Sequence, residues 1–191
     1  MHHIKVAAGQ GLLQGIESNV CSSSSSASSS APKTLPPHEV DLLYQSLDCE
    51  LSEVDSSSEV FEMISTAFTN TAKSLQAASL CGFQTPGVPL VSKIFELHRK
   101  GEAVRFESLS KKAHSNRKLL WHGTDIAAGA AIVSRGLRIL PSSGGRCGRG
   151  IYFANEAAKS GYYVRCSPSG DAIMFLADVA LGDSFPVVGD S

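Results

Sequence analysis

The sequence predicts an α+β fold with a split β-sheet arrangement and a disordered N-terminal tail. Three apolar runs, at residues 90–99, 118–122 and 172–182, are typical of strands. Segments with the apolar spacing or capping residues of helices lie among them, and this combination predicts helices packed against a sheet. We therefore expect a tail over residues 1–36 and a single domain over residues 37–191.

The composition gives no global basis for nucleic-acid or membrane partners, although a local basic patch, such as Lys111-Lys112 with Arg117-Lys118, stays open. Of 191 residues, 42% are hydrophobic and 18% charged, which is typical of a soluble globular protein. The formal net charge of −1 gives no global attraction to nucleic acid or to a membrane surface. Because no apolar run reaches membrane-spanning length and no secretory signal opens the chain, we expect an intracellular protein with no membrane partner.

The five cysteines are odd in number, widely spaced and without a CxxC pair. This pattern predicts free thiols in a reducing compartment rather than a disulfide framework, and it predicts no metal site. The cysteines are Cys21, Cys49, Cys81, Cys147 and Cys166.

The serine-rich stretch at residues 22–30 has eight serines in nine positions. Such a segment buries too little apolar surface to offset the entropy lost on ordering, so it predicts disorder. A phosphorylated regulatory tail is the alternative that composition leaves open.

The first ordered elements are a helix and a strand. Residues 55–71 have apolar residues at helical spacing, and Ser56 and Glu59 have the spacing of a capping box. Residues 90–99 follow as a strand, and residues 100–106 turn out of it.

The next strand and helix are marked at both ends. Residues 118–122 form a nearly continuous apolar run, which predicts a strand buried on both faces. Asp125 is the expected N-cap of a helix over residues 126–135, and Gly136 is its expected C-terminal glycine.

The glycine loop at residues 142–150 matches neither phosphate-binding glycine pattern. We favour a flexible surface loop over one that closes on a ligand. Residues 150–154 predict a strand, Asn155 is the expected cap of a short helix over residues 156–163, and residues 172–182 predict the last strand.

The candidate site combines side chains from three of these elements. His122 and Gly123 end one strand, Tyr152 lies in the next, and Ser160 and Tyr163 lie on the short helix. A lone histidine at a strand end is usually structural, but these residues together suit a flat aromatic ring that bears an amide. Glycine permits close backbone approach, tyrosines stack, and a hydroxyl completes the polar contacts. Nicotinamide is such a ring.

The order and spacing of three stretches resemble the catalytic domain of the poly(ADP-ribose) polymerases, the diphtheria-toxin-like ADP-ribosyltransferase fold. These stretches are "NRKLLWHGT", "GLRILPSSGGRCGRGIYFANEAAKSGYYV" and "MFLADVALG". The resemblance extends over roughly residues 36–190 and is greatest to the third member of the DNA-damage-responsive branch. It implies an NAD+-dependent protein ADP-ribosyltransferase, which uses NAD+ as substrate and releases nicotinamide.

The resemblance also implies roles for the candidate residues. His122 would hold the nicotinamide-ribose 2′-hydroxyl, and Gly123 would pair with the carboxamide through its backbone, with Ser160 adding a third hydrogen bond. Tyr163 would stack on the ring, and Tyr152 would lie on its other side. The implied catalytic residues are His122 and Tyr152, and the implied NAD+-binding residues are His122, Gly123, Arg138, Tyr152, Ser160 and Tyr163.

The family's third catalytic residue is a late glutamate, and the last glutamate in this chain is Glu156. Asp178 falls in a late strand at a position that the family uses structurally. We therefore expect a domain incomplete at its C-terminus, with impaired transfer and little polymer synthesis. A catalytically inactive NAD+-binding or interaction module and a non-functional truncated fragment are the alternatives.

Partners and location follow from the same resemblance. It implies protein acceptors for ADP-ribose, a role in DNA repair and a nuclear location, with the cytoplasm as the alternative. We expect no DNA-binding domain in this chain and no metal.

Overall fold

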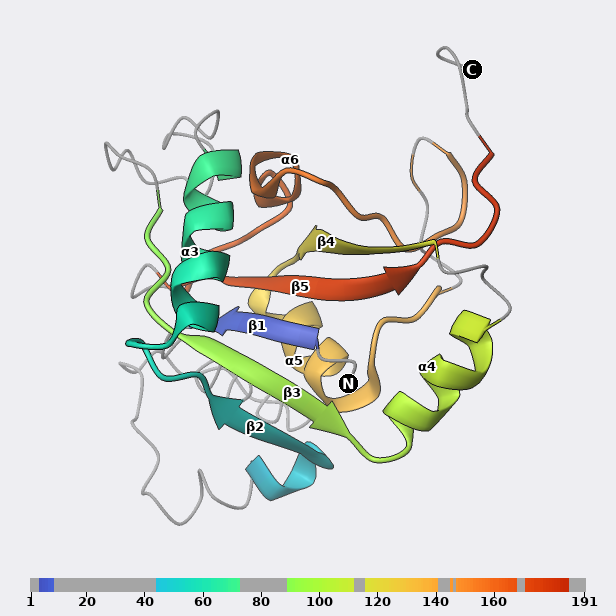
Figure 1. Cartoon of the computed structure of the whole chain (residues 1–191), viewed down its shortest axis with the longest axis horizontal. Coiled ribbons are helices and arrows are strands. Elements are labelled where there is room, and N and C mark those ends of the chain that lie inside the picture. Colours follow the sequence, from blue (N-terminus) through green and yellow to red (C-terminus); the bar gives the residue numbers. More distant parts are fainter. Residues whose placement is uncertain are drawn as a thin grey trace, which may run out of the picture.

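A computed structural model describes residues 44–72, 89–111, 116–140, 145, 147–167 and 171–185, together with the backbone of residues 4–8. These residues form a mixed arrangement of helices around one antiparallel sheet (Figure 1). The α+β fold class is therefore confirmed.

The sheet has five strands in the order β2-β3-β1-β5-β4, and all the pairings are antiparallel. The outer strands are β2 and β4, so β4 pairs with β5 alone among the named strands. The strands are β1 (Ile4–Ala8), β2 (Cys49–Glu53), β3 (Ile94–Arg99), β4 (Arg117–Gly123) and β5 (Ile173–Ala180).

The position of β1 corrects the expected tail. Ile4–Ala8 was assigned to the disordered segment, yet it lies between β3 and β5 and pairs with both. The stretch "IKVAA" is short, but a central position lets its backbone groups bond on both sides. The serine-rich stretch and the rest of residues 1–36 lie outside the described residues, so their disorder stays a prediction.

Helices cover both faces of the sheet. Figure 1 shows α3 crossing one face and α5 lying against the other, with α6 beside the upper end of α3. The helices are α3 (Glu59–Ala72), α4 (Glu102–Ser110), α5 (Ile126–Arg135) and α6 (Ala157–Gly161). The expected strand at residues 90–99 is shorter in the structure, and α4 replaces the turn that we expected after it.

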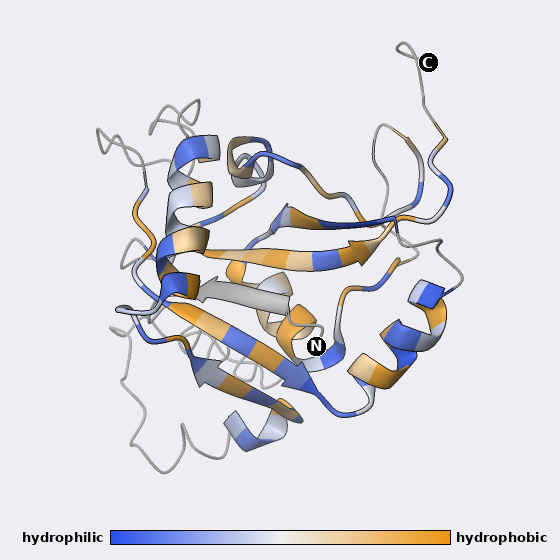
Figure 2. Cartoon of the chain, in the orientation of Figure 1, coloured by the Kyte–Doolittle hydropathy of each residue, from blue (hydrophilic) through white to orange (hydrophobic). Residues whose placement is uncertain are grey.

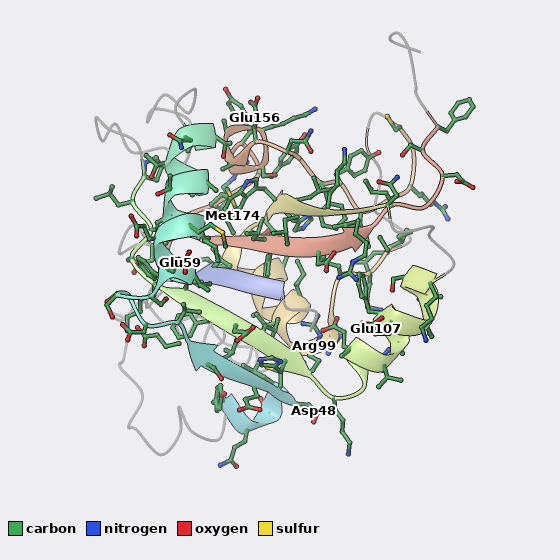
Figure 3. All side chains as sticks on the ribbon, in the orientation of Figure 1. Asp48, Glu59, Arg99, Glu107, Glu156 and Met174 are labelled. Carbon is green, nitrogen blue, oxygen red and sulfur yellow. The ribbon has the colours of Figure 1, made fainter. Side chains whose placement is uncertain are left out.

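Strand β5 is the centre of the core because alternate side chains bury against opposite layers. Met174 and Leu176 pack with α3 and α6, whereas Ile173 and Phe175 pack with α5. Figure 2 shows the resulting apolar colour along most of β5, and Figure 3 shows Met174 beside α3. A strand covered on both faces has a continuous run of apolar residues in its sequence, and this is why β5 was predicted correctly.

The cap of α3 is two residues later than we expected. Ser58 Oγ accepts a hydrogen bond from the backbone N–H of Phe61 at 3.2 Å. Asp55 instead holds the preceding turn, since its Oδ1 accepts from both the N–H and the hydroxyl of Ser57. The prediction of Ser56 as the capping residue was wrong because three consecutive serines offered equivalent candidates.

Both ends of α5 are as predicted. The Asp125 carboxylate accepts from the Ala128 N–H at 2.6 Å, and Gly136 ends the helix with a φ of 78°. The buried guanidinium of Arg99 also donates to the carbonyls of Ile132 and Val133, at 2.9 and 3.0 Å (Figure 3). These bonds satisfy carbonyls in the last turn of the helix and join it to the end of β3.

Three expectations around β4 were wrong. β4 is an outer strand, and its Leu119 is 59% exposed, so the strand is not buried on both faces. Residues 150–154 do not form a strand in the structure, where only Ala154 makes a bridge to Trp121. Glu156, rather than Asn155, precedes the short helix α6, and its side chain makes no capping hydrogen bond.

The cysteines only partly follow their prediction. Among the described residues, Cys49 and Cys147 are free, whereas Cys166 is disulfide-bonded. Wide sequence spacing did not reveal this pairing because folding joins distant segments. Burial raises the pKa of the Cys49 thiol. No helix in the described parts of the chain has the length and apolarity needed to span a membrane.

Candidate active site

The end of β4 presents a row of backbone groups on the side away from β5. Trp121 and Ala154 exchange two backbone hydrogen bonds, of 2.8 and 2.9 Å. The N–H and C=O groups of Trp121 therefore point away from β5. Because successive residues of a strand alternate their backbone direction, those of Gly123 point to the same outer side. An amide-bearing ligand at this edge would meet one donor and one acceptor on the same residue.

Gly123 lies against the backbone of α6. A β-carbon built at Gly123 would lie 1.9 Å from the carbonyl oxygen of Ser160 and 3.0 Å from a methyl group of Val164. No real side chain tolerates the first of these distances, so the packing requires glycine. The close approach brings the end of β4 and the helix segment to a single place.

Tyr163 joins the same group through the backbone. Its N–H donates to the Ser160 carbonyl at 3.1 Å, and that is the oxygen that packs on Gly123. Gly123 and Tyr163 therefore lie on the same side of the molecule. The Tyr163 side chain is 67% exposed, so its ring is open to a ligand from solvent.

The hydroxyl of Ser160 faces inward. The residue is buried, and its Oγ donates to the Trp121 carbonyl at 2.9 Å. The hydroxyl has lone pairs left to accept a hydrogen bond, but it would have to turn its proton away from Trp121 to donate to a ligand. In this structure Ser160 thus fastens α6 to β4.

His122 has a defined tautomer in its neutral form. Its Nδ1 lies 2.8 Å from the backbone carbonyl oxygen of Tyr152, and a carbonyl can only accept. Nδ1 must therefore carry the proton, which leaves Nε2 as an acceptor for a hydroxyl group. The rings of Phe153 and Phe175 lie 5.7 and 6.4 Å from the imidazole, centroid to centroid, and limit its movement.

Tyr152 is placed by the glycine loop. Its hydroxyl donates to the Gly148 carbonyl at 2.6 Å and accepts from the Cys147 N–H at 3.1 Å. The side chain is 41% exposed. The sequence did not single out Cys147 or pair Gly148 with Tyr152, because the richness of this loop in glycine shows that it turns but not which side chain it encloses.

No hydrogen bond or ring contact of the described residues joins the remaining residues to this group. Arg138 is exposed in the segment after α5, and the hydrogen bonds and ring contacts that join the other candidates in the described residues do not include it. Asp178 pairs with the Arg117 guanidinium across β4 and β5. That hydrogen bond raises the pKa of Arg117. Asp178 therefore has a structural partner, in agreement with its expected role.

The described surface also has a groove that lies away from the predicted site residues. A groove of about 450 Å³ runs along α3 and is lined mostly by serine and threonine side chains, none of them a predicted site residue. Among the described residues, no group of three or more histidine, cysteine, aspartate or glutamate side chains has an arrangement that would hold a metal ion.

Comparison with known proteins decides the family. The model of the poly(ADP-ribose) polymerase catalytic domain matches residues 58–189. The chain belongs to this family. It is 42% identical over 149 residues to the protein mono-ADP-ribosyltransferase PARP3 of Homo sapiens and 40% identical over 157 residues to that of Mus musculus. It is 36% identical over 145 residues to poly [ADP-ribose] polymerase 2 of Arabidopsis thaliana.

The alignments cover most of this chain but little of each relative. They include 76%, 81% and 73% of the chain, and 26%, 27% and 21% of the relatives, in the same order. The chain therefore spans about a quarter of the length of the curated relatives it matches. By name, the relatives include both mono-ADP-ribosyltransferases and poly(ADP-ribose) polymerases.

Proposed function

We propose that this chain is an NAD+-dependent ADP-ribosyltransferase domain that holds nicotinamide between Tyr152 and Tyr163, over the backbone of Gly123. The observation that carries the proposal is the geometry at Gly123. Its N–H and C=O point away from β5, and its α-carbon packs directly on the Ser160 carbonyl, to which Tyr163 also bonds. This is the arrangement of donor, acceptor and aromatic face that a carboxamide-bearing ring requires.

The proposed reaction breaks the glycosidic bond between nicotinamide and its ribose. The bonding electrons leave with nicotinamide, the ribose carbon develops positive charge, and an acceptor side chain of a protein forms the new bond. Nε2 of His122, which its tautomer leaves unprotonated, accepts a hydrogen bond from the ribose 2′-hydroxyl and so orients the ribose. NAD+ is the substrate, and the proposal needs no metal.

A second candidate is an NAD+-binding module with weak transfer. The observation that favours it is the absence of any glutamate after Glu156 in these 191 residues. Asp178, one of the few later carboxylates, is already paired with Arg117. A carboxylate beside the developing positive charge would favour the transition state, so these 191 residues tested alone would lose rate of transfer rather than affinity for NAD+.

We further propose protein acceptors, a nuclear location and a role in DNA repair. The names and sequences of the relatives support acceptor modification. The location rests on family resemblance alone and is tested by imaging a tagged copy of the chain. Arg138 is proposed to face the adenosine and diphosphate portion of NAD+, because it is exposed and cationic.

One assay separates the two candidates. The chain is incubated with NAD+ labelled in its adenine portion, and free nicotinamide and protein-bound label are measured. We expect NAD+ to bind, with little label transferred and no polymer ladder. Strong ladders would contradict the impaired reaction but support the transferase. Failure to bind either NAD+ or nicotinamide, by a well-folded chain, would overturn both candidates.

A further inference from the structure

The loop before Tyr152 encloses its phenol group. The hydroxyl oxygen makes two hydrogen bonds, one to the Gly148 carbonyl at 2.6 Å and one from the Cys147 N–H at 3.1 Å. The Gly145 carbonyl also accepts from the Gly148 N–H at 2.9 Å, which closes a turn around these groups. The phenol hydroxyl therefore both donates and accepts a hydrogen bond, and both partners are backbone groups a few residues upstream.

Gly145 lies directly against the aromatic ring. A β-carbon built there would lie between 2.5 and 2.8 Å from three atoms of the Tyr152 side chain. Its φ is not in the left-handed region, so contact with Tyr152, and not backbone conformation, requires the glycine. Gly150 provides a natural contrast, because a β-carbon there would meet nothing within 4 Å and its φ is also ordinary.

The same tyrosine is held at its backbone by His122. The Tyr152 carbonyl accepts from Nδ1 of the imidazole, while the Tyr152 side chain is held by the loop. The loop, Tyr152 and His122 are therefore linked in series. A shift of the phenol within the loop would pull on the carbonyl that sets the histidine tautomer.

We infer that the loop groups that contact Tyr152, which are Gly145, Cys147 and Gly148, form a clamp that positions Tyr152 as one wall of the nicotinamide slot. Gly145 and the Cys147 and Gly148 peptide groups are its positioning elements. The inference rests on the proposed function for the identity of the ligand. The clamp itself rests on the contacts of Tyr152 alone.

The matched variants Gly145→Ala and Gly150→Ala test the clamp. Nicotinamide is titrated against the wild-type chain and both variants, and amide hydrogen exchange at Cys147 is measured without ligand. We expect Gly145→Ala to raise the nicotinamide Kd by about three- to tenfold, because the ring loses its stacking position. Gly150→Ala should stay within about twofold of wild type, as a substitution that touches nothing.

Amide hydrogen exchange at Cys147 tests the loop contacts of Tyr152 independently of the proposed ligand. The Cys147 amide should be protected in wild type and in Gly150→Ala, and exchange rapidly in Gly145→Ala. Tyr152→Phe, which keeps the ring but removes its hydroxyl, should also expose this amide. If nicotinamide fails to bind but the exchange pattern holds, the clamp stands and the proposed function is wrong. Equal protection of Cys147 in all four proteins would overturn the clamp.

Discussion

The two walls of the proposed slot are held in different ways. On the Tyr163 side, Gly123 packs on the Ser160 carbonyl, and the buried Ser160 hydroxyl bonds to β4. On the Tyr152 side, the ring is held by exposed hydrogen bonds from the loop before it. One wall is therefore continuous with the core of the domain, whereas the other is a local surface structure.

Because of this difference, substitutions on the two sides should affect different properties, stability on one side and ligand binding on the other. Changes at the interface between β4 and α6 should lower the free energy of unfolding, because they disturb buried packing. Changes in the loop around Tyr152 should alter ligand binding with little effect on stability. The tyrosine rings themselves are exposed and should behave as binding residues on either side.

The largest effect is expected for Gly123→Ala. Its new methyl group would lie 1.9 Å from the Ser160 carbonyl oxygen, so α6 must move away from β4. We expect a loss of about 3 kcal/mol in the free energy of unfolding, as for overpacking of a buried site. Urea denaturation measures this loss, with Gly150→Ala as the control. A loss below about 1 kcal/mol would contradict the close packing.

Tyr163→Ala should change binding without changing stability. Because the ring is 67% exposed, we expect the free energy of unfolding to stay within about 0.5 kcal/mol of wild type. The nicotinamide Kd should rise about tenfold, through loss of one stacking face.

The neighbouring residue Tyr162 provides the control for that variant. It is 54% exposed, and the proposal gives it no ligand contact. Calorimetric titration of nicotinamide into Tyr162→Ala should give a Kd within about twofold of wild type. Equal weakening in both variants would mean that neither ring forms a specific wall.

A smaller effect is expected for Ser160→Ala. The substitution removes the hydrogen bond to the buried Trp121 carbonyl and leaves that acceptor weakened, at a cost of about 1 kcal/mol. Ser108→Ala is a suitable control, because its hydroxyl bonds to the Arg105 carbonyl on an exposed helix face. Thermal unfolding of the two variants should separate them, and indistinguishable midpoints would argue against a fastening role for Ser160.

The fold was predictable where burial made the sequence pattern simple. β5 is covered on both faces, so its continuous apolar run predicted a strand. α5 was predicted from the residues at its two ends, Asp125 and Gly136. The pattern failed at Ile4–Ala8, where a short strand gains its stability from pairing with β3 and β5. It failed again at residues 150–154, which are apolar but serve the site and the core without joining the ladder.

The candidate site was predictable in its members but not in its linkages. The types and order of His122, Gly123, Tyr152, Ser160 and Tyr163 indicated a ring-binding slot before any coordinates. The sequence did not reveal that the Ser160 carbonyl packs on Gly123, or that the loop binds the Tyr152 hydroxyl. Both are contacts of backbone atoms, which every residue carries, so residue types give no signal for them.

The central claim is that nicotinamide pairs with the backbone of Gly123, and nuclear magnetic resonance of the isotope-labelled chain tests it most directly. Nicotinamide is titrated while the backbone amide signals are followed. We predict a saturable shift of the Gly123 amide signal, accompanied by shifts of the ring signals of Tyr152 and Tyr163. The Gly150 amide signal should not shift. Saturable shifts elsewhere in the protein, with the Gly123 amide unchanged, would contradict the claim.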